Sequence, residues 1–251
     1  MSGRLAGKVA IVTGGGSGFG AEICRKFAEE GASVTVLDVN EKGASEVASQ
    51  IGDGKALAMR CDVTKRSEVN AAIRATIDKF GRVDSYVNNA GITHTNRPLL
   101  EIDESWFDKI FAVNVKAIYF SALEMVPIYR KQGGGTIINV ASTAGVRPRP
   151  GLVVYNSSKG AAITMTRSLA IELAPDNIRV TAVNPVAGET PLLREFMGED
   201  TPEIREKFRS SVPLGRLSTP RDIANTVAYL ASDEAAFLTG VAIEVDGGRC
   251  I

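Results

Sequence analysis

A tyrosine and a lysine four residues apart carry the clearest chemistry in this sequence. Tyr155 and Lys159 belong to a predicted helix over residues 155–173, and their spacing places both side chains on one face. A free tyrosine has a pKa of about 10, too high for a base at neutral pH, but a nearby ammonium group favours the phenolate. Ser142, thirteen residues before the tyrosine, can hydrogen-bond a substrate oxygen. These side chains predict proton transfer to or from a substrate hydroxyl, with Tyr155 as the acid or base.

Taken alone, a Tyr-x-x-x-Lys pair is an ordinary feature of a helix surface. The catalytic interpretation depends on other residues that occur together with this pair, among them Ser142 and Asn114. Asn114 stands in an apolar helical stretch, and a buried amide needs hydrogen-bond partners. Those partners can be purely structural, for example where the amide caps a neighbouring backbone group.

A glycine cluster near the start of the chain is the second chemical feature. Residues 13–20 read Thr-Gly-Gly-Gly-Ser-Gly-Phe-Gly, between an apolar run at residues 9–12 and a helical pattern. Glycines in a strand–turn–helix unit let a phosphate approach the backbone, and the following helix N-terminus attracts it. A flexible linker is the alternative, and the patterned flanks argue against it. The spacing of Gly14, Gly18 and Gly20 is wider than G-x-G-x-x-G, so this turn alone does not decide the family.

An acidic residue follows the second predicted strand, about 20 residues beyond the glycines. Asp38 at this place can accept hydrogen bonds from ribose hydroxyls and would repel a 2′-phosphate. The alternative is a strand-end or capping aspartate. The dinucleotide interpretation predicts NAD(H) as the cofactor.

The elements that must position these residues alternate between strand and helix patterns along the chain. This alternation predicts one α/β domain over residues 1–251, with a Rossmann-like, doubly wound, seven-stranded parallel sheet. The predicted strands cover residues 9–12, 33–37, 56–61, 83–87, 136–141, 178–183 and part of 237–245. The predicted helices cover residues 21–30, 41–50, 65–80, 101–129, 155–173 and 221–232, with a kink or helix end at Pro127.

Together these features resemble the short-chain dehydrogenase/reductase family, from about residue 5 to the end of the chain. These motifs are specific enough to indicate the family, but they say little about the substrate. They are Thr13-Gly14-x-x-x-Gly18-x-Gly20, Asn88-Asn89-Ala90-Gly91, Asn114, Ser142, Tyr155-x-x-x-Lys159 and Asn184-Pro185.

The resemblance implies roles for several of these residues. In the family, the Asn-Asn-Ala-Gly turn stabilises the sheet and touches the adenosine side of the cofactor. Asn114 would bend its helix and hold a water that connects to Lys159, which itself binds the nicotinamide ribose. Ser142 and Tyr155 would contact the substrate. The expected cofactor-binding residues are Gly14, Ser17, Gly18, Phe19, Gly20, Asp38, Asp62, Val63, Asn89, Ala90, Gly91, Tyr155, Lys159, Pro185, Gly188 and Thr190.

The sequence departs from the family pattern after Pro185. Family members usually continue Pro-Gly, whereas here Val186 follows the proline and the glycine arrives at Gly188. Thr190 keeps the usual place, five residues after the proline. We expect it to bind the nicotinamide amide or the pyrophosphate. The polar stretch at about residues 186–212 is expected to form a mobile lid over the substrate.

Composition excludes other classes of function. The formal net charge is zero, with no long run of one sign, which gives no electrostatic support for nucleic-acid or membrane-surface binding. No apolar stretch is expected to approach the roughly 20 residues of a membrane span. Three cysteines without C-x-x-C spacing fit a reducing cytoplasm, and a single histidine, His94, leaves no multi-histidine metal site. We therefore expect a cytoplasmic protein without a bound metal.

The sequence thus predicts hydride transfer between NAD(H) and a secondary alcohol or ketone. One alternative is a 3-oxoacyl-thioester (acyl-carrier-protein) reductase using NADP(H), which Asp38 disfavours. Another is a non-catalytic dinucleotide sensor, which would be free to lose Tyr155 or Lys159, yet both are present. The resemblance also implies a homotetramer, and the apolar stretch at residues 237–245 agrees with burial against a neighbouring subunit.

The substrate pocket is expected to form from residues 142–154, His94 and the lid. Arg147 and Arg149 flank a proline between Ser142 and Tyr155, so their loop should border the substrate mouth. In an extended segment both guanidinium groups share one side and can bind an anionic substrate tail. A solvated or interface loop, or a salt bridge to Glu189 in the lid, is the alternative.

Overall fold

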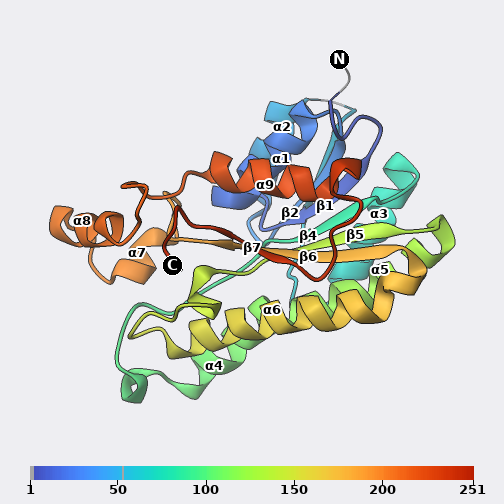
Figure 1. Ribbon diagram of the computed structural model, residues 1–251. Helices are drawn as coiled ribbons and strands as arrows, with labels where there is room; N and C mark the ends of the chain where they lie inside the picture. Colours follow the sequence, from blue (N-terminus) through green and yellow to red (C-terminus); the bar gives the residue numbers. More distant parts are fainter. Residues whose placement is uncertain (1–2, 53) are drawn as a thin grey trace.

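Seven parallel strands form a single sheet at the centre of the protein (Figure 1). The structure, a computed structural model, describes residues 3–52 and 54–251. The order of strands across the sheet is 3-2-1-4-5-6-7, which confirms the predicted doubly wound topology. The order reverses between the first and fourth strands, so a crevice opens there at the carboxyl ends. In chain order the strands are β1 (Val9–Thr13), β2 (Ser33–Asp38), β3 (Ala56–Arg60), β4 (Ser85–Asn88), β5 (Gly135–Val140), β6 (Ile178–Pro185) and β7 (Ala242–Val245).

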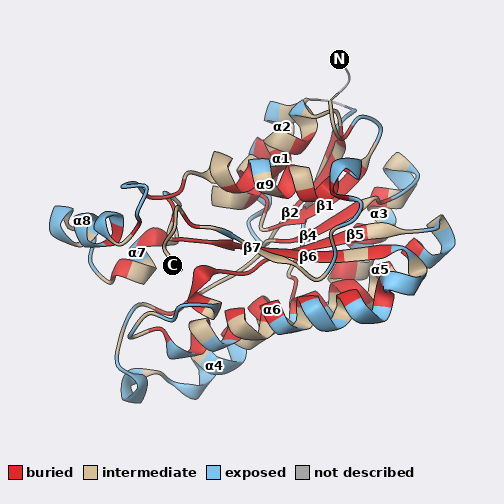
Figure 2. Ribbon diagram, viewed as in Figure 1, coloured by how far each residue is buried: buried red, intermediate tan, exposed pale blue. Residues whose placement is uncertain are grey.

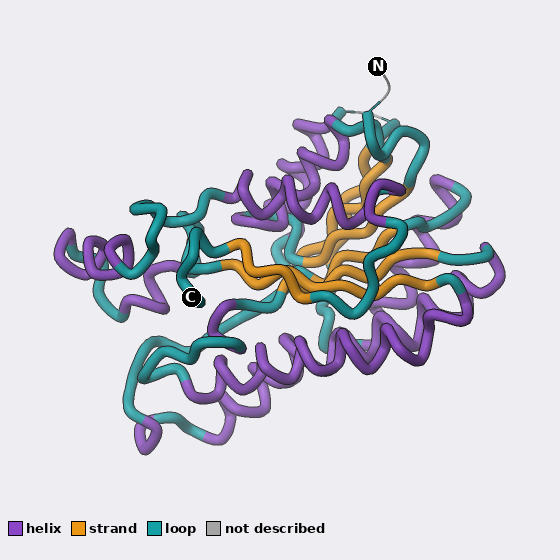
Figure 3. The backbone as a smooth tube through the Cα atoms, in the orientation of Figure 1, coloured by secondary structure: helices purple, strands orange, loops and turns teal. Residues whose placement is uncertain are grey.

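Helices cover both faces of the sheet in two layers (Figure 3). The first, second and ninth helices pack together on one face, and the third to sixth pack on the other. This layering follows from parallel strands, which need a crossover helix between each pair. The helices are α1 (Gly18–Glu29), α2 (Glu41–Ile51), α3 (Arg66–Phe80), α4 (Glu104–Phe111), α5 (Ala117–Gln132), α6 (Val153–Leu173), α7 (Leu193–Met197), α8 (Pro202–Ser210) and α9 (Pro220–Ala231).

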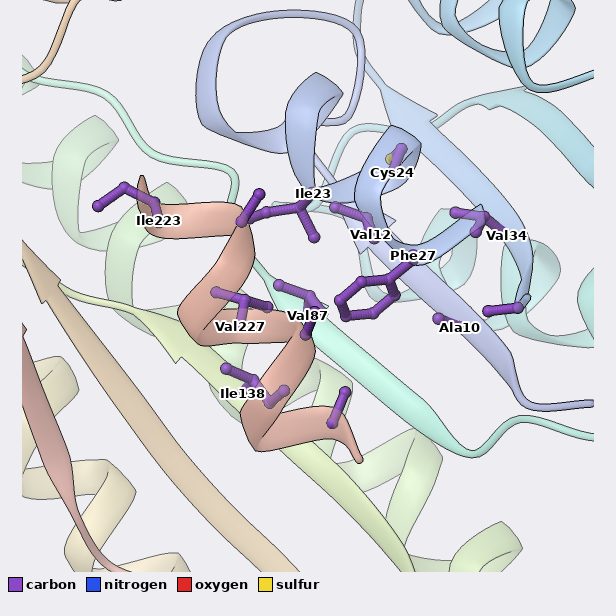
Figure 4. Packing of buried hydrophobic residues seen from close by; sticks show 14 of the residues in the cluster. Ala10, Val12, Ile23, Cys24, Phe27, Val34, Val87, Ile138, Ile223 and Val227 are labelled. Atoms are coloured by element: carbon purple, nitrogen blue, oxygen red, sulfur yellow. The ribbon is translucent and has the colours of Figure 1, made fainter. Parts of the chain in front are cut away.

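The central strands are buried on both faces, as the continuous apolar runs predicted (Figure 2). On one side, Phe27 of α1 inserts between β1 and Val227 of α9, and its side chain is fully buried (Figure 4). Burial of a side chain of this size stabilises the fold by about 1.5–3 kcal/mol. The glycine turn is therefore held between a strand and a helix that are both anchored in the core.

The predicted helix at residues 101–129 differs in the structure. It is divided into α4, a π-helical stretch at Ala112–Lys116 and α5. A helix end at Pro127 is not observed, because α5 runs on to Gln132 and ends where Gly133 takes φ 85°. A proline removes only one helix hydrogen bond, whereas a left-handed glycine is a true C-terminal stop.

The same helical run also corrects the expectation about membrane-length segments. Residues 104–132 form a run of 29 helical residues whose most apolar window has a mean hydropathy of 1.3, enough by length and composition to cross a membrane. In this fold α5 packs on α3 and on the sheet. Of that window, 39% is buried, so part of its apolar surface is left uncovered.

The predicted lid contains two short helices, α7 and α8. Their buried faces meet in a small apolar cluster that includes Leu193, Met197 and Phe208. Leu217 from the chain just after the lid completes this cluster. The lid is thus a packed unit beside the sheet and not an irregular loop.

Candidate active site

A cavity of about 650 Å³ opens at the carboxyl ends of the central strands. Open parallel sheets bind their ligands at this edge. Its wall runs from the end of β2, past the glycine turn after β1, to the first turn of α6. Predicted site residues in the wall are Gly14, Ser17, Gly18, Phe19, Asp38, Asp62, Val63, Asn89, Ala90, Gly91, Ser142, Tyr155, Lys159, Pro185, Gly188 and Thr190, whereas Gly20 and Asn114 lie behind it.

Tyr155 and Ser142 meet at one end of this cavity. Ser142 follows β5 and its Oγ accepts a hydrogen bond from the backbone N–H of Ala144 at 3.0 Å. That bond leaves the hydroxyl proton of Ser142 free to donate. Burial raises the pKa of Tyr155 to about 12, although interaction with Ser142 lowers it. The tyrosine is therefore a neutral phenol in the protein alone.

Lys159 lies one turn further along α6 with its side chain buried. Its Nζ donates to the carbonyl oxygen of Val140 at 2.8 Å and lies 5.7 Å from the ring centroid of Tyr155. Burial lowers the pKa of Lys159 to about 8. The expected lowering of the Tyr155 pKa by this lysine is therefore not what the protein alone shows, because desolvation of the phenol outweighs every other influence on it.

Asn114 connects the loop after β4 to the catalytic helix. Its Oδ1 accepts from the N–H of Ile92 at 2.9 Å, and its Nδ2 donates to the carbonyl of Ile92 at 3.0 Å. The same Nδ2 donates to Oγ of Ser158 at 3.0 Å, next to Lys159. The π-helical stretch around Asn114 widens the helix there, and π-bulges often occur at functional sites. The side chain is fully partnered and holds the two cavity walls together.

The glycine turn is locked to the turn after β4. The side-chain Nδ2 of Asn89 donates to the carbonyl oxygens of Thr13 and Gly14, at 2.8 and 3.0 Å. A Cβ on Gly20 would lie 2.0 Å from the oxygen of Gly14, so only glycine fits. Gly14 itself has φ 62°, a conformation that favours glycine. Gly20 thus shapes the turn from behind, without facing the cavity.

Asp38 presents a fixed carboxylate at the far end of the cavity. Oδ2 accepts from the N–H of Gly16 and Oδ1 from the N–H of Asn40, both at 2.9 Å. Within residues 3–52 and 54–251, no lysine or arginine forms a salt bridge with it. The site therefore presents hydrogen-bond acceptors with negative charge to any group that enters beside Gly16.

Residues 186–188, within the stretch that departs from the family pattern, line the cavity beside the glycine turn. A Cβ on Gly188 would lie 2.6 Å from the ring of Phe19, so the shifted glycine is required for this close approach. The methyl group of Thr190 faces Gly18, where a Cβ would be 3.5 Å away. Both residues line the cavity beside the glycine turn.

Phe196 of α7 is a site residue that the sequence did not single out. Its ring centroid lies 5.0 Å from that of Tyr155, and it lines the cavity. Apolar spacing within residues 190–213 could have indicated a buried helix face there, but not the partner that it covers. The lid thus brings an aromatic side chain against Tyr155.

His94 does not line the cavity, which corrects the expectation that it helps to form the pocket. The imidazole is fully buried, with Nδ1 2.9 Å from the carbonyl of Thr95. The hydroxyl of Thr95 donates to the carboxylate of Glu195 in α7 at 2.6 Å, and the N–H of Asn96 donates to the carbonyl of Glu195. These bonds attach residues 95–96 to the lid, and the imidazole of His94 remains buried in the protein.

Arg147 and Arg149, which the sequence predicted to project to one side, contact different partners. Arg147 is exposed and its Nη1 donates to the backbone oxygens of Arg249 and Ile251, at 2.6 and 3.2 Å. Arg149 is half-buried, with its guanidinium 4.4 Å from the ring centroid of Phe208. In the described parts of the chain, neither forms a salt bridge with Glu189.

The residues present fit a dinucleotide. The glycine turn leaves backbone open to a phosphate, Asp38 offers acceptors to ribose hydroxyls, and the cavity continues to Tyr155. Fold and site together define a dinucleotide-dependent oxidoreductase.

Comparison with known proteins agrees with this class. Residues 14–249 match the family model described as enoyl-(acyl carrier protein) reductase. A 4-formylbenzenesulfonate dehydrogenase of Comamonas testosteroni is 51% identical, over 99% of this chain and 100% of the relative. A 3-oxoacyl-[acyl-carrier-protein] reductase of Thermotoga maritima is 38% identical, over 99% of this chain and 100% of the relative.

Among solved structures, a 3-ketoacyl-(acyl-carrier-protein) reductase of Brucella melitensis complexed with NADH superposes with a TM-score of 0.94. It is 47% identical, with 98% of this chain and 100% of that chain covered. The chain belongs to the short-chain dehydrogenase/reductase family, and it is an oxidoreductase that acts on CH–OH groups.

Proposed function

We propose that this protein transfers a hydride between NAD(H) and a secondary alcohol or ketone, with Tyr155 as general acid and base. The observation that carries the proposal is the meeting of Ser142, Tyr155 and Lys159 at one end of a cavity whose other end is Asp38. A reacting oxygen at that end can reach both hydroxyl groups, which is the geometry that acid–base catalysis needs.

Tyr155, Ser142 and Lys159 have separate roles in the proposed reaction. In the alcohol direction, Tyr155 removes the hydroxyl proton, and in the ketone direction it returns one. Ser142 donates its free hydroxyl proton to the substrate oxygen and orients it. Lys159 uses one N–H on Val140, and two remain to bind a ribose hydroxyl and to stabilise the phenolate. When bound, the nicotinamide ring accepts or supplies the hydride.

Asn114 keeps this arrangement in place. Its hydrogen bonds to Ile92 and Ser158 set the distance between the loop after β4 and α6. A Cβ on Gly91 would lie 3.3 Å from Nζ of Lys159 and 3.5 Å from Oδ1 of Asn114, so the glycine admits both side chains. The proposed arrangement of Tyr155 and Lys159 thus also depends on Asn114, which lies outside α6.

The proposal includes a preference for NAD(H) over NADP(H). The carboxylate of Asp38 is held by two backbone N–H groups and retains lone pairs for ribose hydroxyls. A 2′-phosphate in that place would meet a negative charge. The NADH bound to the Brucella melitensis relative supports this choice.

Reduction of a 3-oxoacyl thioester is the second candidate. It is favoured by the names of two relatives, at 38% and 47% identity. Those substrates carry a long acyl-carrier group, and the alternative therefore predicts high activity on 3-oxoacyl thioesters and little on simple alcohols.

The test is a panel of secondary alcohols, polyols, ketones and 3-oxoacyl thioesters, each assayed by the absorbance of NADH and NADPH. The proposal expects turnover of at least one alcohol–ketone pair with NAD(H), abolished in Ser142→Ala. Turnover confined to 3-oxoacyl thioesters with NADPH selects the second candidate. Binding of NADH without turnover of any substrate would point to a sensor.

Assembly as a homotetramer belongs to the same proposal. The helical run of α4 and α5 leaves Phe107 and Tyr119 exposed, and β7 is an edge strand that is half-buried in the isolated chain. Exposed apolar side chains on a long helix and an open sheet edge favour association. Light scattering at micromolar concentration should give four times the chain mass, and a monomer mass would contradict this part of the proposal.

A further inference from the structure

Three arginines from two distant segments lie together beside the lid. Arg147 and Arg149 come from the loop before α6, and Arg249 lies near the end of the sequence. Arg147 binds the backbone of Arg249, and the charges of both Arg147 and Arg249 act on Arg149. Nη2 of Arg149 also reaches Oγ of Ser211, just after α8, at 3.3 Å.

Across residues 3–52 and 54–251, none of the three arginines forms a salt bridge with an aspartate or glutamate. Nε and Nη1 of Arg249 are buried without a hydrogen-bond partner. Burial and the two neighbouring guanidinium groups lower the pKa of Arg149 to about 10. Buried N–H donors without acceptors are costly, and an oxyanion is the group that satisfies several of them at once.

Two aromatic rings lie between the cluster and the reactive end of the cavity, whose lining includes Phe196 but not the arginines. The guanidinium of Arg149 stacks on Phe208, and Phe196 packs against the apolar cluster that contains Phe208. Phe196 in turn faces the ring of Tyr155. The backbone of Arg149 is also attached to α6, because Nδ2 of Asn156, the residue after Tyr155, donates to the carbonyl oxygen of Arg149 at 2.8 Å.

We propose that Arg149 and Arg249 form an oxyanion subsite that binds a carboxylate or sulfonate at the far end of the substrate. The inference rests on the proposed function and adds a substrate class to it. The preferred substrate has its carbonyl or hydroxyl group at Tyr155, an apolar middle against Phe196, and an anionic end at the arginines. Arg147 is already occupied by the terminal segment and contributes charge without a direct contact.

The arrangement favours an oxyanion group that offers two oxygens on one side, for a physical reason. A guanidinium offers parallel N–H donors to two oxygens, and stacking on Phe208 fixes the plane of Arg149. A carboxylate or sulfonate thus binds with both orientation and charge matched, whereas an uncharged group of the same shape leaves the donors unsatisfied.

The experiment compares 4-acetylbenzenesulfonate with its uncharged methyl sulfone, and a longer biphenyl pair of the same design, as ketone substrates. In the unmodified enzyme we expect the lower KM for the charged member of at least one pair. Arg149→Gln and Arg249→Gln should raise the ratio of charged to neutral KM by about tenfold or more. Arg149→Lys should restore part of the difference, because it retains the charge without the paired donors.

Arg209→Gln is the matched control, since this α8 arginine pairs with Glu206 on the surface. It should leave the KM ratio within about twofold of the unmodified enzyme. Equal effects of Arg149→Gln on charged and neutral ketones overturn the subsite and assign the arginine to packing of the lid. A fall in oligomer mass with an unchanged ratio overturns it in favour of a subunit contact.

Calorimetric binding in the presence of NADH separates this inference from the proposed function. If no ketone is turned over, the proposed function fails, and 4-acetylbenzenesulfonate titrated into the unmodified protein and into Arg149→Gln still decides the subsite. Weaker binding to the variant, with the difference reduced at high salt, supports it. Identical binding, or none, overturns it.

Discussion

The carboxylate of Asp38 accepts a hydrogen bond from the backbone N–H of Gly16, in the glycine turn, at 2.9 Å. This contact joins the end of β2 to the turn after β1, so the acidic group and the phosphate cradle are held as one unit. A Cβ on Gly16 would lie 3.0 Å from Oδ2 of Asp38, which is tighter than an ordinary contact. The position of the carboxylate is therefore set by backbone and does not depend on a flexible partner.

We expect the unmodified enzyme to prefer NAD(H) over NADP(H) by about tenfold or more in kcat/KM, because a 2′-phosphate would lie beside the fixed carboxylate. Asp38→Ala combined with Val39→Arg should reverse the preference, since it removes the repulsion and adds a phosphate partner. Asp38→Ala alone is the control for loss of charge. A preference for NADP(H) in the unmodified enzyme would contradict the assignment.

Tyr155→Phe should lower kcat by at least about 100-fold, since it removes only the proton-transfer group. Binding of NADH, followed by its fluorescence, should change by less than about twofold, because the ring and its contact with Phe196 remain. Tyr119→Phe, an exposed tyrosine on α5, is the matched control and should retain full activity. Tyr155 would be the wrong base if the variant kept most of its kcat.

The ionisation of Tyr155 should depend on the cofactor. Burial raises the pKa of Tyr155 to about 12 in the protein alone, so the phenol stays neutral at any working pH. A positive charge on bound NAD⁺ favours the phenolate and should lower this pKa by about two units or more. The rate of alcohol oxidation should therefore rise with pH, and the rate of ketone reduction, which needs the neutral phenol, should fall.

Tyrosinate absorbance measures this directly, as the difference between the unmodified protein and Tyr155→Phe. Without NAD⁺ the difference should appear only above about pH 10, the ordinary tyrosine value, and with NAD⁺ it should move to lower pH. Ionisation of the free protein near neutral pH would show that burial does not govern this residue.

Gly20→Ala should lower the free energy of unfolding by about 1–3 kcal/mol and abolish NADH binding. The added Cβ would lie 2.0 Å from the oxygen of Gly14 and 2.4 Å from Nδ2 of Asn89, so the glycine turn must move. Gly160→Ala in α6 is the control, since its Cβ meets nothing nearer than an oxygen of Gly145 at 3.8 Å. It should stabilise the helix by about 0.5–1 kcal/mol. Equal thermal midpoints for the two variants would contradict the tight packing at Gly20.

The chain order of the seven strands, the glycine turn and the shared helix face of Tyr155 and Lys159 could be predicted from the sequence. Each of these follows from patterns within a few residues, because apolar periodicity and turn residues act locally. The family pattern also predicted Asp38 and Asn114 as members of the site. The partners of Asn114 were open, since its amide could have been capped by any nearby backbone group.

The surroundings of the cavity could not be predicted in this way. The pKa of Tyr155 depends on its burial in the folded protein, and its neighbour Phe196 comes from a helix with no recognisable motif. Thr95 binds Glu195 100 residues away, and Arg147 binds the backbone of Arg249 102 residues away. Contacts at such separations are set by how the whole chain packs around the sheet, and no local pattern encodes them.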